Sequence, residues 1–512
     1  MYNDKVNSHR LVFSILFWIL ISLFYFVSHL WALANLPIFA DEAIYIRWAQ
    51  LIQDEPLRYL FFALNDGKTP LYIWQLVISL PLFSDPLYAA RFLSVVGGFF
   101  QVLAGVWLVR EVKGGRLAQL LVAFLFTILP FWFFHHRIAL MDGWMTLWIT
   151  CSLAALIHAL ESRQLVWAVG SGLFLGAAIL TKIPAVLILP SFGVLLFWSS
   201  TKGSFWVAIK CLVVTGLVSL IVSATLLISP AFPQLFARSS DFLFSVTDVF
   251  RGIWLQTIFN TPSYLNYFWQ YLTAGGVVLS LLAVMWRSSR RKALIVIGCF
   301  LAYSGPIALM GRVVFPRYFL PAALFLTVLA ALSLEKLLIS ATRWKQTAGL
   351  LLLIIIIYQA SQFIVPALSD PNQIPFVSAD QGQYLTEWSS GHGIKETFFL
   401  ITQAAKSASI LVATEGYFGT LPDGLLVYFH HQDLFNIAIE GVGQPINSVP
   451  QKLIDDQDAF NTLWLVVNSH RLNFALPENA LFAEYCRPYQ GPCLQVWDLT
   501  EFIKSGSYAK IE

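Results

Sequence analysis

The sequence has little charge. Of its 512 residues only 12% are aspartate, glutamate, lysine or arginine, whereas 57% are hydrophobic. A soluble globular protein carries about 25% charged residues, so this composition excludes an ordinary soluble domain. The formal net charge is +3, which is too small to indicate a nucleic-acid partner.

Several common catalytic signatures are also missing. The sequence contains no glycine-rich phosphate loop, no cysteine and histidine spacing typical of a metal site, and no nucleophile elbow. His135 and His136 are adjacent and therefore point in different directions on a helix, which disfavours a metal shared between them. We therefore expect no cofactor, and a divalent metal is the open alternative.

Cysteine is scarce, with five residues in the whole chain. Cys151, Cys211 and Cys299 lie in apolar runs, where a free cysteine behaves as a small buried hydrophobe. Cys486 and Cys493 lie in a polar C-terminal segment. If that segment is extracytoplasmic, these two residues either form a disulfide or remain as two free thiols, and the sequence leaves both alternatives open.

Long apolar runs are abundant, and most of them match the roughly 30 Å thickness of a bilayer core. The first run is too long for a signal peptide and is followed at once by two acids, so we interpret it as a retained span. Residues 71–83 are too short and are interrupted by Pro81, which predicts an interfacial segment. The pattern predicts a polytopic α-helical membrane protein with about eleven transmembrane helices, near residues 11–33, 87–109, 117–134, 144–160, 165–180, 185–198, 206–228, 265–286, 293–310, 318–338 and 348–365.

The distribution of basic residues predicts an orientation. With the N-terminus in the cytoplasm, the densest basic cluster, Arg287 to Lys292, lies inside, together with Lys5, Arg10 and Arg110. The opposite side receives fewer cations, which are mixed with acids, as the positive-inside rule requires. We expect a multi-pass protein of the plasma or inner membrane with its C-terminal domain outside the cytoplasm.

The C-terminal segment has a different character from the apolar runs. Short β-like stretches at residues 409–413 and 463–467 alternate with helix-like stretches at 394–405 and 449–460. This alternation predicts a small α/β domain. The loop at residues 414–419 is either a binding loop or a well-packed turn. The predicted domains are therefore residues 1–365, with a first outer loop at 34–86, and residues 366–512.

Charged residues at the ends of the spans converge on the predicted outer side. A carboxylate there can accept a proton from a hydroxyl nucleophile, and nearby cations can hold a phosphate leaving group. Each residue also has a plain structural alternative, such as a charged loop for the acids, a snorkelling cation for Lys68 or the capping of helix carbonyls by Lys182. The candidate residues are Asp41, Glu42, Lys68, Arg91, Asp142, Lys182, Arg317 and Tyr318.

The order and spacing of these segments resemble the GT-C glycosyltransferases. The resemblance covers about residues 1–365, and bacterial members of the protein O-mannosyltransferase-like family 39 and lipid A aminoarabinose transferase-like enzymes are the most similar. The segments that carry it are Asp41-Glu42, Lys68-Thr69-Pro70-Leu71-Tyr72, Ala90-Arg91-Phe92-Leu93-Ser94, Met141-Asp142, Leu180-Thr181-Lys182 and Pro316-Arg317-Tyr318-Phe319-Leu320-Pro321.

The resemblance implies the inverting transfer of a sugar from a polyprenyl-phosphate donor to an extracytoplasmic acceptor, which is a protein, a lipid or a cell-surface glycan. Asp41 would be the base or the carboxylate that orients the acceptor, with Glu42 beside it and Asp142 as a second acid. Lys68 would bind the lipid phosphate, in a segment that reads Lys-Thr-Pro where the family has a Lys-Pro-Pro-like pattern. The remaining predicted substrate-binding residues are Arg91, Lys182, Arg317 and Tyr318.

Two other functions fit parts of the sequence. A transporter or flippase of polyprenyl-linked sugars would need charges at the middle of the membrane and matched broken helices, whereas the charges here lie at span ends. A receptor would bind glycan through its C-terminal domain and use the spans as an anchor, for which eleven spans are excessive.

Overall fold

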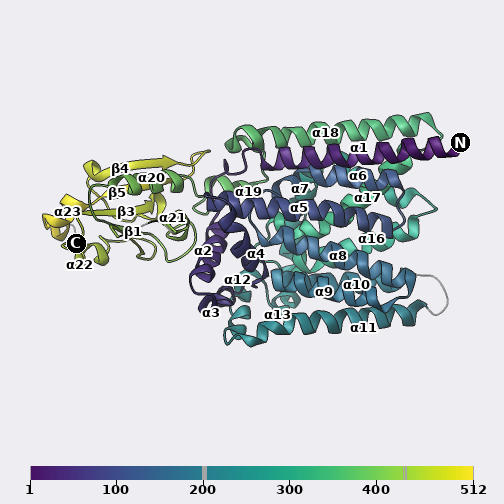
Figure 1. Cartoon of the computed structure of the whole chain (residues 1–512). Coiled ribbons are helices and arrows are strands. Elements are labelled where there is room, and N and C mark those ends of the chain that lie inside the picture. The colour runs from purple at the N-terminus through teal and green to yellow at the C-terminus, as the bar shows by residue number, and fades with distance from the viewer. Residues whose placement is uncertain (1, 199–203, 431, 433–434, 511–512) are drawn as a thin grey trace. The chain divides into compact units, whose positions relative to one another are not determined.

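The computed structural model describes residues 2–198, 204–430, 432 and 435–510. The chain, drawn whole in Figure 1, forms two compact units that alternate along the sequence. The first unit contains Met1–Leu33, Leu60–Gln75 and Arg91–Ser369, and the second contains Ala34–Tyr59, Leu76–Ala90 and Asp370–Glu512. The division of the chain into independent domains after residue 365 stays a prediction.

The first unit is built from helices. Its longer helices are α1 (Tyr2–Leu30), α5 (Pro86–Glu111, whose first turn belongs to the second unit), α6 (Arg116–Ile128), α8 (Met141–Ser162), α9 (Leu165–Thr181), α11 (Ser204–Ser223), α14 (Trp254–Tyr271), α15 (Thr273–Leu282), α16 (Arg290–Met310), α17 (Leu320–Leu338) and α18 (Arg343–Ser369). Shorter helices include α4 (Leu71–Ser79), α7 (Pro130–His135), α10 (Leu189–Val194), α12 (Ser239–Phe242) and α13 (Val246–Asp248).

The prediction of a polytopic helical membrane protein is confirmed. Among the described residues, six helices are long and apolar enough to cross a bilayer, and a seventh span results if α14 and α15 count as one. Five apolar helices of 10–17 residues accompany them. The count of eleven spans stays a prediction. The apolar run at 265–286 is not one straight helix, because it is bent by 104° between α14 and α15.

Helix α17 forms the centre of the first unit. It packs against α6, α8, α15, α16 and α18, and 89% of its most apolar 18-residue window is buried. The corresponding windows of α11 and α18 are only 22% buried, although both helices are strongly apolar. Exposed apolar surface of this extent is suited to contact with lipid chains.

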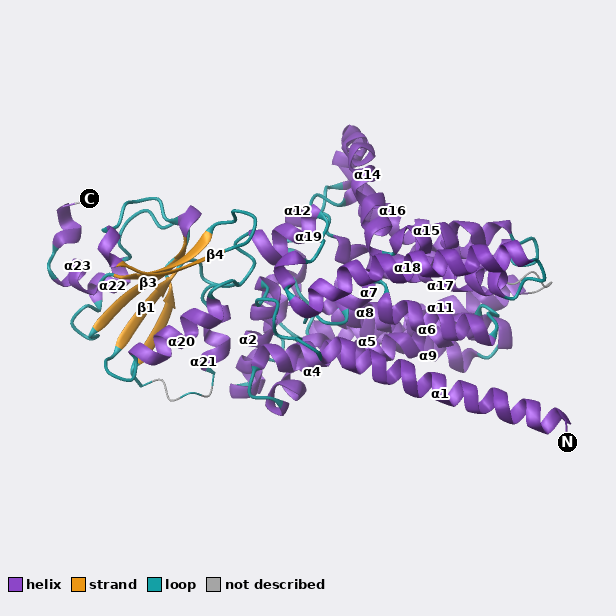
Figure 2. Ribbon diagram, turned by 90° about the horizontal axis from the view of Figure 1, so that it is seen from above, coloured by secondary structure: helices purple, strands orange, loops and turns teal. Residues whose placement is uncertain are grey.

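The second unit contains a five-stranded sheet (Figure 2). Its strands are β1 (Ile410–Thr414), β2 (Ile437–Gly441), β3 (Thr462–Asn468), β4 (Leu481–Cys486) and β5 (Cys493–Asp498). The order in the sheet is β2-β1-β3-β5-β4, with β2, β1 and β3 parallel and the last two strands antiparallel. The helices of this unit are α2 (Ala40–Asp54), α3 (Pro56–Tyr59), α19 (Ser378–Gln381), α20 (Ile394–Ala404), α21 (Asp423–Phe429), α22 (Gln451–Asp455) and α23 (Thr500–Lys504).

The C-terminal sheet confirms the expected α/β character of this segment. The predicted strands at 409–413 and 463–467 coincide with β1 and β3, whose residues are almost all buried. Alternate residues of these strands, such as Leu411 and Leu465, share a core with Leu453 of α22 and Ile503 of α23. The helix expected at 449–460 is shorter, because only α22 is helical there.

Cys486 and Cys493 form a disulfide, a pairing that the sequence left open. The two residues face each other in the register of β4 and β5, so the bond closes the hairpin between these strands. The other three cysteines are free, and Cys211 and Cys299 are buried.

Candidate active site

An ion pair joins the beginning of α8 to the end of α9. Lys182 donates from Nζ to both carboxylate oxygens of Asp142, at 2.8 and 2.9 Å. Asp142 lies in the first turn of α8 and is buried, and Lys182 is the residue that follows α9. Both charges are favoured by the helix dipoles, because an acid is stabilised at a helix N-terminus and a cation at a C-terminus.

Two of the predicted cations lie over the ring of Tyr318. The Nζ of Lys182 lies 5.1 Å from the ring centroid, and the guanidinium carbon of Arg317 lies 5.6 Å from it. Arg317 is itself buried and also stacks on the ring of Phe315 at 5.1 Å. The aromatic faces attract both cations and so hold them in place. The structure therefore brings Asp142, Lys182, Arg317 and Tyr318 together.

Two residues that the sequence did not single out as site residues lie in the same neighbourhood. His135, at the end of α7, is close enough to Asp142, Lys182 and Arg317 to interact with all three electrostatically. Tyr303 of α16 is buried and interacts with the charge of Asp142. Tyr303 lies inside an apolar run, and nothing in the sequence marks it as close to an acid.

Lys68 belongs to a second charged cluster. Its Nζ lies 2.7 Å from Asp66 Oδ2, and the other oxygen of Asp66 accepts a hydrogen bond from Arg238. Gly67 connects the lysine to its partner with a positive φ of 70°, and a Cβ there would meet the carbonyl oxygen of Leu235 at 3.3 Å. A glycine therefore suits this turn. Asp66 and Arg238 were missed, because they are 172 residues apart in the sequence.

The two clusters border one hydrophobic core. Leu64, which precedes Lys68 by four residues, packs in the same group of buried side chains as Leu180, two residues before Lys182. Leu71 and Ile183 lie at the edge of this group. The segment that carries Lys68 and the segment that carries Lys182 are thus held together by apolar packing.

Arg91 lies at a different place in the first unit. Its guanidinium donates to the carbonyl oxygen of Leu33 at 2.9 Å, and the side chain is buried. Nearby, Arg137 donates to the carbonyls of Ser28 and His29 at 2.7 and 2.9 Å. These two arginines hold the last turn of α1 and the residues that follow it, so positioning is the role that these contacts support.

Asp41 and Glu42 lie in the first turn of α2, in the second unit. Glu42 is fully buried, and its Oε2 accepts a hydrogen bond from the backbone N–H of Phe39 at 3.0 Å. This is half of a capping box, in which a glutamate secures the start of its own helix. Asp41 is partly exposed, so of the two acids it is the one better able to meet a substrate.

Metal ligands do not gather around these residues in the described part of the chain. The one grouping found there consists of Glu484, Cys486 and Cys493. The two cysteines are bonded to each other, and a disulfide sulfur is not the thiolate that a metal requires. Independence from a metal stays a prediction.

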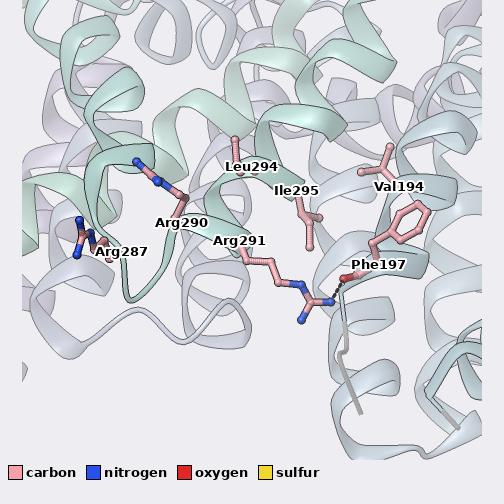
Figure 3. A pocket seen from close by; sticks show the side chains of 7 residues that line it. All are labelled: Val194, Phe197, Arg287, Arg290, Arg291, Leu294 and Ile295. Atoms are coloured by element: carbon pink, nitrogen blue, oxygen red, sulfur yellow. Dashed lines mark hydrogen bonds between the residues drawn. The ribbon is translucent and has the colours of Figure 1, made fainter. Parts of the chain in front are cut away.

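An open hollow of about 500 Å³ lies elsewhere in the first unit (Figure 3). Its apolar wall comes from residues beside α10 and in the first turns of α16, and its cations are Arg287, Arg290 and Arg291. Arg291 donates to the backbone oxygen of Phe197. None of the predicted site residues lines this hollow, which separates it from the candidate active site.

One family of known proteins matches part of the chain. A family model described as dolichyl-phosphate-mannose-protein mannosyltransferase matches residues 59–235. This range includes Lys68, Asp142 and Lys182. A comparison with curated proteins returned no relative of the chain.

Solved structures match over nearly the whole chain. ArnT from Cupriavidus metallidurans in the apo state has a TM-score of 0.58 at 14% identity, covering 95% of this chain and 98% of its own. This match shows that the two chains share a fold. The same ArnT bound to undecaprenyl phosphate has a TM-score of 0.57 at 14% identity, covering 94% of this chain and 97% of its own. The Archaeoglobus fulgidus oligosaccharyltransferase in the apo form has a TM-score of 0.54 at 12% identity, covering 89% of this chain and 69% of its own.

The chain therefore has the expected helical membrane fold with a C-terminal sheet. At 12–14% identity the solved structures establish the fold alone. The roles of individual residues have to be argued from the contacts described above.

Proposed function

We propose that this protein is a GT-C glycosyltransferase, which transfers a hexose or a pentose from a polyprenyl-phosphate donor to an extracytoplasmic acceptor. The observation that carries the proposal is the placement of Lys182 and Arg317 on the ring of Tyr318, beside Asp142. ArnT has been solved with undecaprenyl phosphate, and an archaeal oligosaccharyltransferase with dolichol-phosphate, on folds similar to this one. Both ligands are polyprenyl phosphates of the proposed class.

Lys182, Arg317 and Lys68 are the cations proposed to hold the donor phosphate. Arginine offers a planar pair of N–H donors to phosphate oxygens, whereas lysine acts as a compact point charge. A phosphate that leaves as an anion is stabilised by such cations as its charge develops. The carboxylate of Asp142 orients the ammonium group of Lys182 through two hydrogen bonds.

Asp41 is proposed as the base. In an inverting transfer, the acceptor hydroxyl attacks the anomeric carbon from the face opposite the phosphate. The new C–O bond forms as the bond to the phosphate oxygen breaks, the hydroxyl proton passes to Asp41, and polyprenyl phosphate leaves. Glu42 is proposed to hold the start of α2, which carries Asp41, through its hydrogen bond to Phe39.

The membrane orientation belongs to the same proposal. The basic residues Arg287 to Lys292 would lie in the cytoplasm with the N-terminus, and the C-terminal domain would lie outside, in the plasma or inner membrane. The disulfide of Cys486 and Cys493 supports this orientation, because disulfides persist in oxidising compartments outside the cytoplasm.

Sugar transfer by purified protein in proteoliposomes tests the proposal. A polyprenyl-phosphate donor with a labelled sugar is supplied together with a membrane extract that contains the acceptor. Asp41→Asn should lower the transfer rate by at least about a hundredfold, since a positioned base contributes that much or more. Asp54→Asn is the matched control, because Asp54 is an exposed acid at the other end of the same helix.

Full transfer by Asp41→Asn would remove this residue from the mechanism. Movement of the intact donor across the bilayer without transfer, by the unaltered protein, would contradict the enzyme and match a flippase.

A further inference from the structure

The parallel strands of the C-terminal sheet change direction at β1. From β1 the chain continues to β2 on one side and then returns to β3 on the other. In open α/β sheets, ligands bind outside the carboxyl ends of the strands at such a switch point. The residues that follow Thr414 of β1 and Asn468 of β3 occupy this position.

A buried hydrogen-bond network links the two strand ends. Glu415 accepts a hydrogen bond from the backbone N–H of Asn468 at 2.9 Å and forms an ion pair with Arg471 at 3.0 Å. Glu415 and Asn468 are both buried. Arg471 remains partly exposed and, because a guanidinium carries several N–H donors, it can still donate to a ligand.

One aromatic side chain contacts this network, and two more follow Glu415 closely in the chain. The guanidinium carbon of Arg471 lies 4.4 Å from the ring centroid of Trp388. Trp388 nevertheless keeps 37% of its surface exposed, and Tyr417, in the loop after β1, is 71% exposed. Phe418 is also exposed. The loop that carries Tyr417 and Phe418 approaches Trp388, because a Cβ on Gly419 would lie 3.6 Å from the tryptophan ring.

The loop that carries two of these rings is held by backbone contacts. Gly416 donates from its N–H to the carbonyl of Gly443 at 2.8 Å, which joins the loop after β1 to the loop after β2. A Cβ on Gly441 would lie 2.3 Å from the carbonyl oxygen of Gly416, so this close approach requires glycine. The ring of Tyr417 lies over Gly443. The aromatic surface is thus presented by a constrained loop.

We propose that this edge of the sheet, formed by Trp388, Tyr417, Phe418 and Arg471, is a binding site for a neutral carbohydrate. The C–H faces of a sugar ring carry partial positive charge and pack on the negative face of an aromatic ring. Arg471 supplies hydrogen bonds to hydroxyl oxygens. Glu415 and Asn468 are positioning residues, which fix the arginine and the strand ends.

The charge of the site favours a neutral sugar over an anionic ligand. Arg471 is already paired with Glu415, and the neighbouring buried Arg487 donates its N–H groups to the carbonyl oxygens of Ser390 and Pro492. The cations of this network are therefore already engaged by protein oxygens, which disfavours a phosphate ligand. The four proposed contact residues are aromatic or cationic, with no aliphatic wall for a peptide side chain. The site contains none of the residues proposed to bind or activate the donor, so carbohydrate binding and sugar transfer can be measured separately.

Binding of neutral trisaccharides to the full-length protein in lipid nanodiscs tests the proposal. The probes are maltotriose, mannotriose and N-acetylchitotriose, observed by saturation-transfer NMR, with glucose 6-phosphate and an aromatic-free hexapeptide as contrasts. At least one trisaccharide should bind, and Tyr417→Ala and Trp388→Ala should each weaken it by at least about tenfold. Because Trp388 also supports Arg471, Trp388→Phe should restore most of the binding.

Phe435→Ala is the matched control. Phe435 is 97% exposed and lies just before β2, at the amino end of the parallel strands. Binding that is the same in Tyr417→Ala as in the unaltered protein would overturn the proposal, as would failure of all three trisaccharides or preference for either contrast probe. Asp41→Asn should bind the trisaccharide normally, so loss of the carbohydrate site and loss of transfer are measured independently.

Discussion

Lys182 donates hydrogen bonds to both oxygens of Asp142, and these residues begin and end neighbouring helices that pack against each other. The same ammonium group faces the ring of Tyr318. The pair is therefore both a link between α8 and α9 and part of the surface proposed to receive the donor phosphate. Substitutions can separate these two roles.

Lys182→Met should destabilise the protein, because it leaves the buried carboxylate of Asp142 without its cation. Removing one partner of a buried ion pair costs about 3–5 kcal/mol. The double variant Asp142→Asn with Lys182→Met should recover most of this loss in thermal unfolding, since no charge is stranded. Its sugar transfer should stay at least about a hundredfold below that of the unaltered protein.

Lys113→Met provides the comparison for this pair. Lys113 contacts Glu161 at 3.8 Å in an exposed ion pair, so its removal should cost less than about 1 kcal/mol and leave transfer intact. Normal transfer by the double variant would show that Asp142 and Lys182 serve only the packing of α8 on α9.

Glu42 and Asp41 should respond differently to neutral substitution. Glu42→Gln keeps an oxygen that can accept the hydrogen bond from Phe39, so transfer should fall by less than about tenfold. Glu42→Ala leaves that buried N–H without this partner and should destabilise the protein by about 1–2 kcal/mol. Transfer assays and thermal unfolding of both variants, beside Asp41→Asn, measure these effects. A loss in Glu42→Gln as large as that in Asp41→Asn would instead make Glu42 catalytic.

Much of the fold follows from periodicity and length. The apolar run at 318–338 predicts α17, and the β-branched runs at 409–413 and 463–467 predict β1 and β3, because each pattern fits one kind of element. The run at 265–286 was predicted to form one span, but hydropathy gives only the length of an apolar segment and does not show where a helix bends. Thr273 has a positive φ of 65° at the point where the helix turns by 104°.

Only part of the candidate active site could be predicted from the sequence, because the sequence does not show which distant segments meet in the folded chain. Asp142 and Lys182 end adjacent predicted spans on one side of the membrane, so topology alone places them near each other. Asp66 and Arg238 are ordinary loop residues in the sequence, and only the folded chain pairs them. Tyr303 lies within an apolar helix, where a tyrosine is expected to pack rather than to approach an acid.

The disulfide gives a prediction that needs no activity assay. Thiol titration of the unfolded, unreduced protein should detect Cys151, Cys211 and Cys299, and prior reduction should add two more groups. Replacing both Cys486 and Cys493 by serine should lower the stability of the C-terminal domain by about 2 kcal/mol, because the bond closes a short loop. Equal thiol counts before and after reduction would contradict the pairing.

Asp423 predicts how the stability of the C-terminal domain depends on pH. Burial raises the pKa of this carboxyl to about 6, although it accepts a hydrogen bond from Gly419 and is near Arg47. An unfolded aspartate has a pKa of about 3.9. Between these values the folded domain binds more protons than the unfolded chain, so this residue makes stability fall as pH rises from about 4 to about 6, by roughly 2–3 kcal/mol.

Hydrogen exchange or thermal unfolding of the full-length protein across this range, compared with Asp423→Asn, measures the effect. The stability of Asp423→Asn should not fall between pH 4 and pH 6 in the way described for Asp423. At pH 7 the variant should be the more stable protein, because its neutral amide oxygen can still accept the hydrogen bond from Gly419. His392 acts in the opposite direction, since burial lowers its pKa to about 4 and its contribution is lost as pH falls. His392 is the same in both proteins, so the difference between the two curves isolates Asp423. A difference that does not change between pH 4 and pH 7 would mean that Asp423 titrates normally in the folded domain.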